Sequence, residues 1–129
     1  MDEFANTANR IKGYLDEAGE FEGSGLSDKK DYYAASMICF SAINESLRLA
    51  ELFMAKKAYA APATYREIFD TLLSRKAISS ATARSMKLLV QKRNLIAHEY
   101  GEVQPADVKG IIGNLGDIKA FISELAKKY

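Results

Sequence analysis

Residues 28–54 read DKKDYYAASMICFSAINESLRLAELFM, and this stretch decides the fold. Ser27 or Asp28 is suited to the start of a helix, because either side chain accepts a hydrogen bond from a backbone N–H of the first turn. The apolar positions that follow recur every three or four residues, as on one face of an α-helix. They are Tyr32, Tyr33, Met37, Ile38, Phe40, Ile43, Leu47, Ala50 and Met54. The stretch therefore predicts one long amphipathic helix at the centre of the fold.

The helical period continues on both sides of this stretch, and the sequence lacks the strict apolar/polar alternation of strands. A first helix is expected over about 2–21, ending at the break Glu22-Gly23-Ser24-Gly25. Downstream, residues 60–63 (AAPA) are expected to end the long helix. Thr64, with Glu67 three positions later, then resembles a capping box that opens a short helix through Leu73.

Two more helices complete the expected fold. Ser79 or Ser80 caps a fourth helix, which should end near Glu99 or Tyr100, with Gly101 available to close it. A last helix follows Pro105 and keeps one apolar face to the C-terminus. Short connections favour antiparallel packing. We therefore predict an all-α antiparallel bundle of four to five helices that forms a single domain over residues 1–129.

Composition excludes several classes of protein. The chain has 129 residues, of which 48% are hydrophobic, and its net charge of +1 provides no overall attraction to nucleic acid or membrane. The N-terminus lacks the features of a secretory signal, and no apolar run is long enough to span a bilayer, so a cytoplasmic protein with no membrane partner is expected. One cysteine and one histidine, Cys39 and His98, cannot build a disulfide or a Cys/His zinc cluster. Neither a metal nor a cofactor is expected, and Cys39 is interpreted as a small buried hydrophobic residue.

Positive charge is concentrated in one segment of the chain. Residues 71–98 contain Arg75, Lys76, Arg84, Lys87, Lys92 and Arg93, with no Asp or Glu, which gives 6 − 0 = +6. The rest of the chain has 12 basic and 17 acidic residues, a balance of −5. The segment is a candidate anion-binding surface, and a solvated basic face without a ligand is the alternative.

The densest group of chemically capable residues is the run 93–100, RNLIAHEY. At about 100° per residue, Asn94 and His98 share one helix face, whereas Arg93 lies about 140° around the helix from His98. Arg93, Asn94, His98 and Tyr100 converge only if the helix unwinds after Ala97 or if two copies of the run face each other across a two-fold axis, and we favour the second. Arg93 also falls in an apolar stripe, where its guanidinium needs a phosphate or a carboxylate. Glu45 or Asn44 of the long helix is a candidate to pair with Arg93 or to line the cleft between the two copies.

These residue types suit cleavage of RNA. A histidine acts as general acid or base near neutral pH, and an arginine binds phosphate oxygens. In RNA the 2′-hydroxyl serves as the internal nucleophile, so that a base and a cation suffice without a metal. Asn94 could orient the histidine or the phosphate, and Tyr100 could bind a phosphate oxygen, act as a nucleophile or accept a modification. Without further information, however, a histidine or a tyrosine at a helix end more often closes the helix than carries out chemistry.

The spacing Arg93, four residues, His98, one residue, Tyr100 matches the Arg-x4-His-x-Tyr motif of the HepT-like toxins in the HEPN superfamily. Residues 43–47, 65–69 and 77–79 resemble the same family, and the resemblance covers about residues 30–125. It implies a HEPN-like helical homodimer with paired motifs in a cleft between protomers. It also implies a metal-independent endoribonuclease, the toxin of a toxin-antitoxin pair whose antitoxin is an MntA-like nucleotidyltransferase.

The resemblance assigns a role to each motif residue. Arg93 becomes the cation for the phosphate and the transition state, His98 the acid/base and Asn94 the supporting polar residue. Tyr100 becomes the acceptor of AMP transferred by the antitoxin, and this AMPylation would place phosphate charge and bulk in the cleft and so block RNA.

Two other functions remain open. The chain could be a non-catalytic nucleotide-binding or regulatory HEPN subunit of a nucleotidyltransferase complex, because a fold is often kept while its activity changes. It could also be a helical interaction protein in which Arg93 only stabilises a dimer.

Overall fold

We describe a computed structural model of the chain, which places residues 2–98 and 103–129. Within these ranges the chain forms helices only. They are α1 (Glu3–Gly19), α2 (Lys29–Lys56), α3 (Tyr65–Ser74), α4 (Ser80–His98), α5 (Pro105–Gly113) and α6 (Leu115–Lys128). The all-helical prediction is confirmed.

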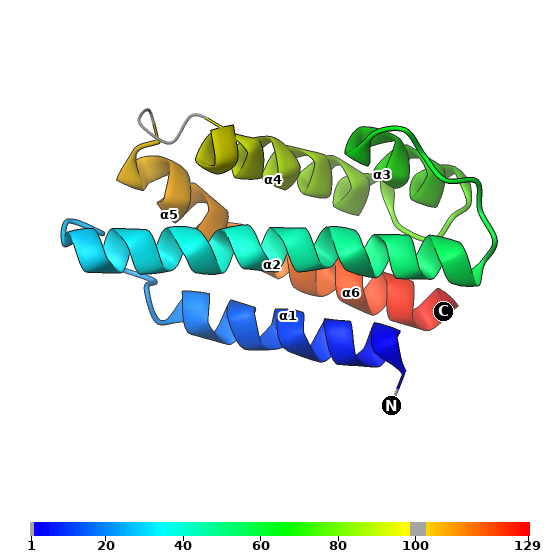
Figure 1. Cartoon of the computed structure of the whole chain (residues 1–129), viewed down its shortest axis with the longest axis horizontal. Coiled ribbons are helices and arrows are strands. Elements are labelled where there is room, and N and C mark those ends of the chain that lie inside the picture. The colour runs from blue at the N-terminus through cyan, green and yellow to red at the C-terminus, as the bar shows by residue number, and fades with distance from the viewer. Residues whose placement is uncertain (1, 99–102) are drawn as a thin grey trace.

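The long helix α2 is the centre of the bundle, as its length and pattern predict (Figure 1). Helix α1 runs antiparallel to α2 along one side, and α4 and α6 pack against α2 as well. Helices α3 and α4 form an antiparallel pair (Figure 1). The two termini lie at the same end of the bundle, where the rings of Phe4 and Tyr129 stack with their centroids 4.0 Å apart.

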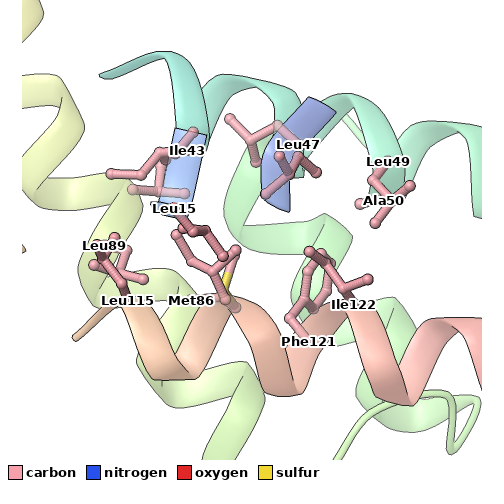
Figure 2. Close-up of a cluster of buried hydrophobic side chains, with 14 of the residues drawn as sticks. Leu15, Ile43, Leu47, Leu49, Ala50, Met86, Leu89, Leu115, Phe121 and Ile122 are labelled. Carbon is pink, nitrogen blue, oxygen red and sulfur yellow. The ribbon is translucent and has the colours of Figure 1, made fainter. Parts of the chain in front are cut away.

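One hydrophobic cluster holds the helices together. Figure 2 shows Ile43 and Leu47 of α2 close to Met86 and Leu89 of α4, with Phe121 of α6 beside them. All five side chains are at most 3% exposed, so each contributes about 1.5–3 kcal/mol of hydrophobic free energy relative to an exposed position. This burial fixes the side of α4 that faces the core and hence the side that faces outward.

The helix starts agree with the predicted caps. The Asp28 carboxylate accepts a hydrogen bond from the Lys30 N–H at 2.7 Å, and the Thr64 hydroxyl accepts one from the Glu67 N–H at 3.2 Å. The Glu67 carboxylate accepts from the Ala63 N–H, one residue before the position expected in a capping box.

Two helix ends differ from the prediction. Helix α1 ends at Gly19 rather than Phe21, and Gly23, with φ = 81°, provides the left-handed residue of the following turn. Helix α2 ends at Lys56, before the expected stop at residues 60–63. Its end is a Schellman motif, in which the Tyr59 N–H donates to the Met54 carbonyl and Ala58 takes a left-handed φ of 58°.

The predicted last helix is interrupted. Asn114, with φ = −106° and ψ = 12°, separates α5 from α6. The break gives each part its own buried face, with Val108 and Ile111 on α5 and Ile118 and Phe121 on α6. Counted as one bent helix, α5 and α6 complete the five-helix arrangement expected from the sequence.

Candidate functional site

The Arg93–Tyr100 run begins in the last two turns of α4, as the sequence predicts. Arg93 and Asn94 lie within the helix, and His98 is its last described residue. Tyr100 and Gly101, and with them the expected helix end at residues 99–100, lie outside the described residues. The backbone of α4 remains helical through Ala97 and His98. The described chain therefore does not show the unwinding after Ala97 that would bring the motif together within one protomer.

A carboxylate from another helix positions the start of α4. Glu124 of α6 accepts a hydrogen bond from the Ser79 N–H at 2.6 Å and another from the Thr82 hydroxyl. The Ser79 hydroxyl accepts from the Thr82 N–H at 3.1 Å, which confirms Ser79 as a capping residue. These contacts satisfy backbone donors at the positive end of the helix dipole. Together with the buried Met86 and Leu89, they fix the axis and rotation of the helix that carries the motif.

Arg93 is half-buried, as its place in the apolar stripe predicts, but its partner is an aromatic ring. Its guanidinium carbon Cζ lies 5.1 Å from the centroid of the Tyr65 ring at the start of α3. A cation over a ring face at this distance is a stabilising cation–π contact. The Arg93 Nε atom is buried and has no hydrogen-bond partner among the described residues. Arg93 thus has one buried donor without a described partner, in addition to the contact of its guanidinium with the ring.

The suggested pairing of Arg93 with Glu45 is wrong. The Glu45 carboxylate forms an ion pair with Arg10 of α1, with a distance of 2.8 Å between Nη1 and Oε2. Helix α1 packs against the side of α2 that carries Glu45, so the nearer arginine binds this carboxylate. Asn44 of α2 forms no hydrogen bond with Arg93 among the described contacts.

Asn94 lies on the outer surface of α4 and lines a pocket of about 580 Å³ between α3 and α4. Tyr65 and Arg66 of α3 line one wall, and Arg84, Lys87 and Gln91 of α4 line the other. We call this pocket the α3–α4 groove. Asn94 and Tyr65 place the groove at the same end of α4 as Arg93.

The basic segment 71–98 is divided by the fold. Arg84 and Lys87 line the α3–α4 groove, whereas Arg75 stacks on the Tyr59 ring with its Cζ atom 4.6 Å from the centroid. Lys87 forms an ion pair with Asp70 of α3, which neutralises part of the charge. Of the basic segment, the groove therefore contains only Arg84 and Lys87, and α3 adds Arg66 to them.

Cys39 is fully buried, as predicted, and burial raises the pKa of its thiol to about 12. It is therefore protonated at neutral pH and unsuited to nucleophilic chemistry. Among the described residues, no group of three or more His, Cys, Asp or Glu side chains is arranged to hold a metal ion. In the same part of the chain, no helix combines the length and the apolar character needed to cross a membrane.

The sequence profile of the family described as "Ribonuclease HepT-like" matches residues 5–125, almost the whole chain. The chain belongs to the HepT-like family. A search of curated proteins finds no match to this HepT-like chain.

Solved structures share the fold of the HepT-like chain. The tri-AMPylated HEPN toxin of Shewanella oneidensis, solved in complex with its MNT antitoxin, superposes with a TM-score of 0.89 at 19% identity, covering 98% of this chain and 99% of the toxin chain. A chain of a toxin-antitoxin complex with AMP-PNP gives a TM-score of 0.89 at 18% identity, with the same coverage. A cytosolic protein of unknown function, YutE from Bacillus subtilis, gives 0.80 at 15% identity, covering 96% of this chain and 89% of that protein.

Two residues of the site, Tyr65 and Arg66, belong to a stretch that resembles the family, but the sequence assigned neither of them a role at the site. Tyr65 begins a short helix and Arg66 follows it, and neither falls in a periodic pattern that indicates a contact with α4. Their proximity to Arg93 and Asn94 is a consequence of how α3 packs on α4, which local sequence patterns do not describe.

Proposed function

We propose that this HepT-like chain is the ribonuclease toxin of a toxin-antitoxin pair, a metal-independent endoribonuclease restrained by an MNT nucleotidyltransferase antitoxin. One observation carries the proposal: the complete Arg-x4-His-x-Tyr motif starts in the last turns of α4, in a chain that belongs to the HepT-like family. The shared fold with a HEPN toxin solved in complex with an MNT antitoxin supports it.

The proposed reaction is attack of the RNA 2′-hydroxyl on the adjacent phosphodiester. His98, as general base, removes the 2′-hydroxyl proton, and the oxygen forms a new bond to phosphorus. The bond from phosphorus to the 5′-oxygen breaks, and that oxygen takes up a proton from a general acid. The products are a 2′,3′-cyclic phosphate and a 5′-hydroxyl end. No water or metal ion enters this step.

Arg93 and Asn94 act on the phosphate in this mechanism. A guanidinium stabilises the extra negative charge that develops on the phosphate oxygens, and in a partly buried site this stabilisation is larger than in water. The half-buried guanidinium of Arg93, held over the Tyr65 ring, is the group that we assign to bind such an oxygen. Asn94, on the exposed side of α4, supports His98 or the phosphate through its amide.

We further propose that the active form is a homodimer with the two motifs facing each other. Within an intact helix, Arg93 lies about 140° around the axis from position 98. A second copy related by a two-fold axis places the arginine of one protomer near the histidine of the other. The helical backbone of α4 through His98 supports this arrangement over unwinding.

The antitoxin would control the toxin by transferring AMP from ATP to Tyr100. The tyrosine oxygen attacks the α-phosphorus, pyrophosphate leaves, and the phenolic proton is released. The attached AMP brings negative charge and bulk to the motif, which excludes the RNA phosphate. Nothing in this regulation requires a cofactor bound to the toxin itself.

The proposal is tested by RNA cleavage with the purified full-length chain, its intact mass checked to exclude a modified Tyr100. We expect His98→Ala and Arg93→Ala each to reduce cleavage by at least a hundredfold while retaining helical circular dichroism. Lys119→Ala, at an exposed position of α6, serves as a control and should cleave RNA at the rate of the wild-type chain.

Cleavage that persists in both motif variants would exclude the proposed site. No cleavage of any RNA by the unmodified chain, together with measurable binding of ATP or of the nucleotidyltransferase, would instead identify a regulatory HEPN subunit.

A further inference from the structure

The α3–α4 groove has the chemistry of a site for single-stranded RNA. Three cationic side chains line it, from Arg66, Arg84 and Lys87, and its described lining residues include no Asp or Glu. Lys87 is engaged with Asp70, but the ion pairs found among the described residues involve neither Arg66 nor Arg84. Both arginines are exposed and stand on opposite walls. The groove therefore presents two available guanidinium groups toward the same space.

The same groove offers surfaces for nucleobases. Tyr65 is 43% exposed and Leu88 is 52% exposed, although both are large apolar residues. The Gln91 and Asn94 amides also line the groove and can both donate and accept hydrogen bonds. Proteins that bind single strands combine a positively charged groove, which follows the phosphates, with aromatic groups against which bases stack. This combination distinguishes the groove from a merely solvated basic face.

The position of the groove connects it to the motif. It follows α4 from Ser80 to Asn94, and His98 is one helical turn beyond Asn94. Arg84 precedes His98 by fourteen residues, a distance of about 21 Å along the helix axis. That length accommodates several nucleotides of an extended strand.

We propose that the α3–α4 groove binds the single-stranded RNA flanking the cleaved bond, with Arg66 and Arg84 contacting its phosphates. This inference rests on the proposed ribonuclease function. It adds the surface along which the RNA strand extends away from the motif. It assigns Arg66 and Arg84 to substrate binding and not to the chemical step. RNA is the chosen occupant because guanidinium groups on two walls match a polyanion.

The test measures binding of a fluorescently labelled single-stranded RNA to full-length His98→Ala protein, which does not cleave it, as salt concentration is varied. Arg66→Gln and Arg84→Gln in this background should each weaken binding by about five- to tenfold at low salt. Each should also reduce the slope of log K against log salt by about 0.7, the value for one phosphate contact to a single strand. Arg75→Gln is the matched control, because it removes the same charge from the basic segment outside the groove, and it should change affinity by less than about twofold.

Unchanged binding in both groove variants, or an equal loss in Arg75→Gln, would overturn the inference. Loss of antitoxin binding by Arg66→Gln and Arg84→Gln with normal RNA binding would also overturn it, by assigning the groove to the protein partner. The ribonuclease proposal fails separately. A chain that binds RNA through the groove but never cleaves any RNA refutes the proposed activity alone, whereas normal cleavage and binding by both groove variants refutes the groove alone.

Discussion

Arg93 is held over an aromatic ring, and this contact gives Tyr65 a positioning role. Replacing Tyr65 with Phe keeps the ring face under the guanidinium, whereas Leu removes it. A cation–π contact contributes about 0.5–2 kcal/mol, so Tyr65→Leu should lower kcat for RNA cleavage by roughly two- to thirtyfold while Tyr65→Phe retains it. Steady-state kinetics on both variants measures this difference. Equal kcat in the Leu and Phe variants would contradict the positioning role.

The environment of Arg93 is only partly predictable from the sequence. Helical phasing correctly placed Arg93 in an apolar stripe that would bury much of its side chain. It could not identify the partner, because the partner depends on which helix packs nearby. Glu45 pairs with Arg10 of α1 instead, and the packing of α3 places Tyr65 against Arg93.

The buried thiol of Cys39 makes the free energy of unfolding depend on pH. Burial raises the pKa of its thiol from 9.0 to about 12, so above about pH 9 the thiol ionises in the unfolded chain but not in the folded chain. The resulting stabilisation is fully present below about pH 9 and is lost as the pH rises toward 12. Between about pH 8.5 and 10.5, the free energy of unfolding should therefore fall more steeply in the unmodified chain than in Cys39→Ala. Denaturant titrations that give parallel pH profiles for the two proteins would show that the thiol ionises equally in both states.

The early end of α2 leads to a prediction at the scale of the element. Ala58 occupies the left-handed position of the Schellman motif with φ = 58°, where a Cβ atom is unfavourable. Ala58→Gly should therefore raise the free energy of unfolding by about 0.5–1 kcal/mol. Ala34→Gly, at an exposed position inside α2, should lower it by a similar amount, about 0.5–1 kcal/mol. Chemical denaturation distinguishes these opposite signs, and a loss of stability in Ala58→Gly would contradict the assigned helix end.

Helix starts were easier to predict from the sequence than helix ends. Asp28, Thr64 and Ser79 are short polar side chains whose capping hydrogen bonds are local, and the structure contains all three. The end at Ala58 lacks the glycine that usually marks a left-handed closure, and it is accompanied by packing of Tyr59 on Phe53. The break at Asn114 likewise depends on how the two halves of the last helix meet the core. Such tertiary preferences leave little trace in local sequence.

The proposed cleft between two facing motifs requires two chains. Leu95 follows Asn94 on the motif helix and is 37% exposed, although it is apolar. A charge at this position should disfavour close approach of two motif helices while leaving the folded protomer intact. We therefore expect analytical ultracentrifugation of the wild-type chain to give twice the 14.3 kDa mass of one chain. Leu95→Glu should raise the dissociation constant of the dimer by at least tenfold. A wild-type chain that is monomeric while it cleaves RNA would exclude the shared cleft.

The central claim is that His98 cleaves RNA by activating the 2′-hydroxyl without a metal. The most direct measurement is to incubate a labelled RNA in excess EDTA with the unmodified chain and with His98→Ala, and to determine the chemical ends of the products. We expect fragments with 2′,3′-cyclic phosphate and 5′-hydroxyl ends from the wild-type chain, and at least a hundredfold less of them from His98→Ala. Fragments that carry 5′-phosphates, or cleavage that EDTA abolishes, would contradict it.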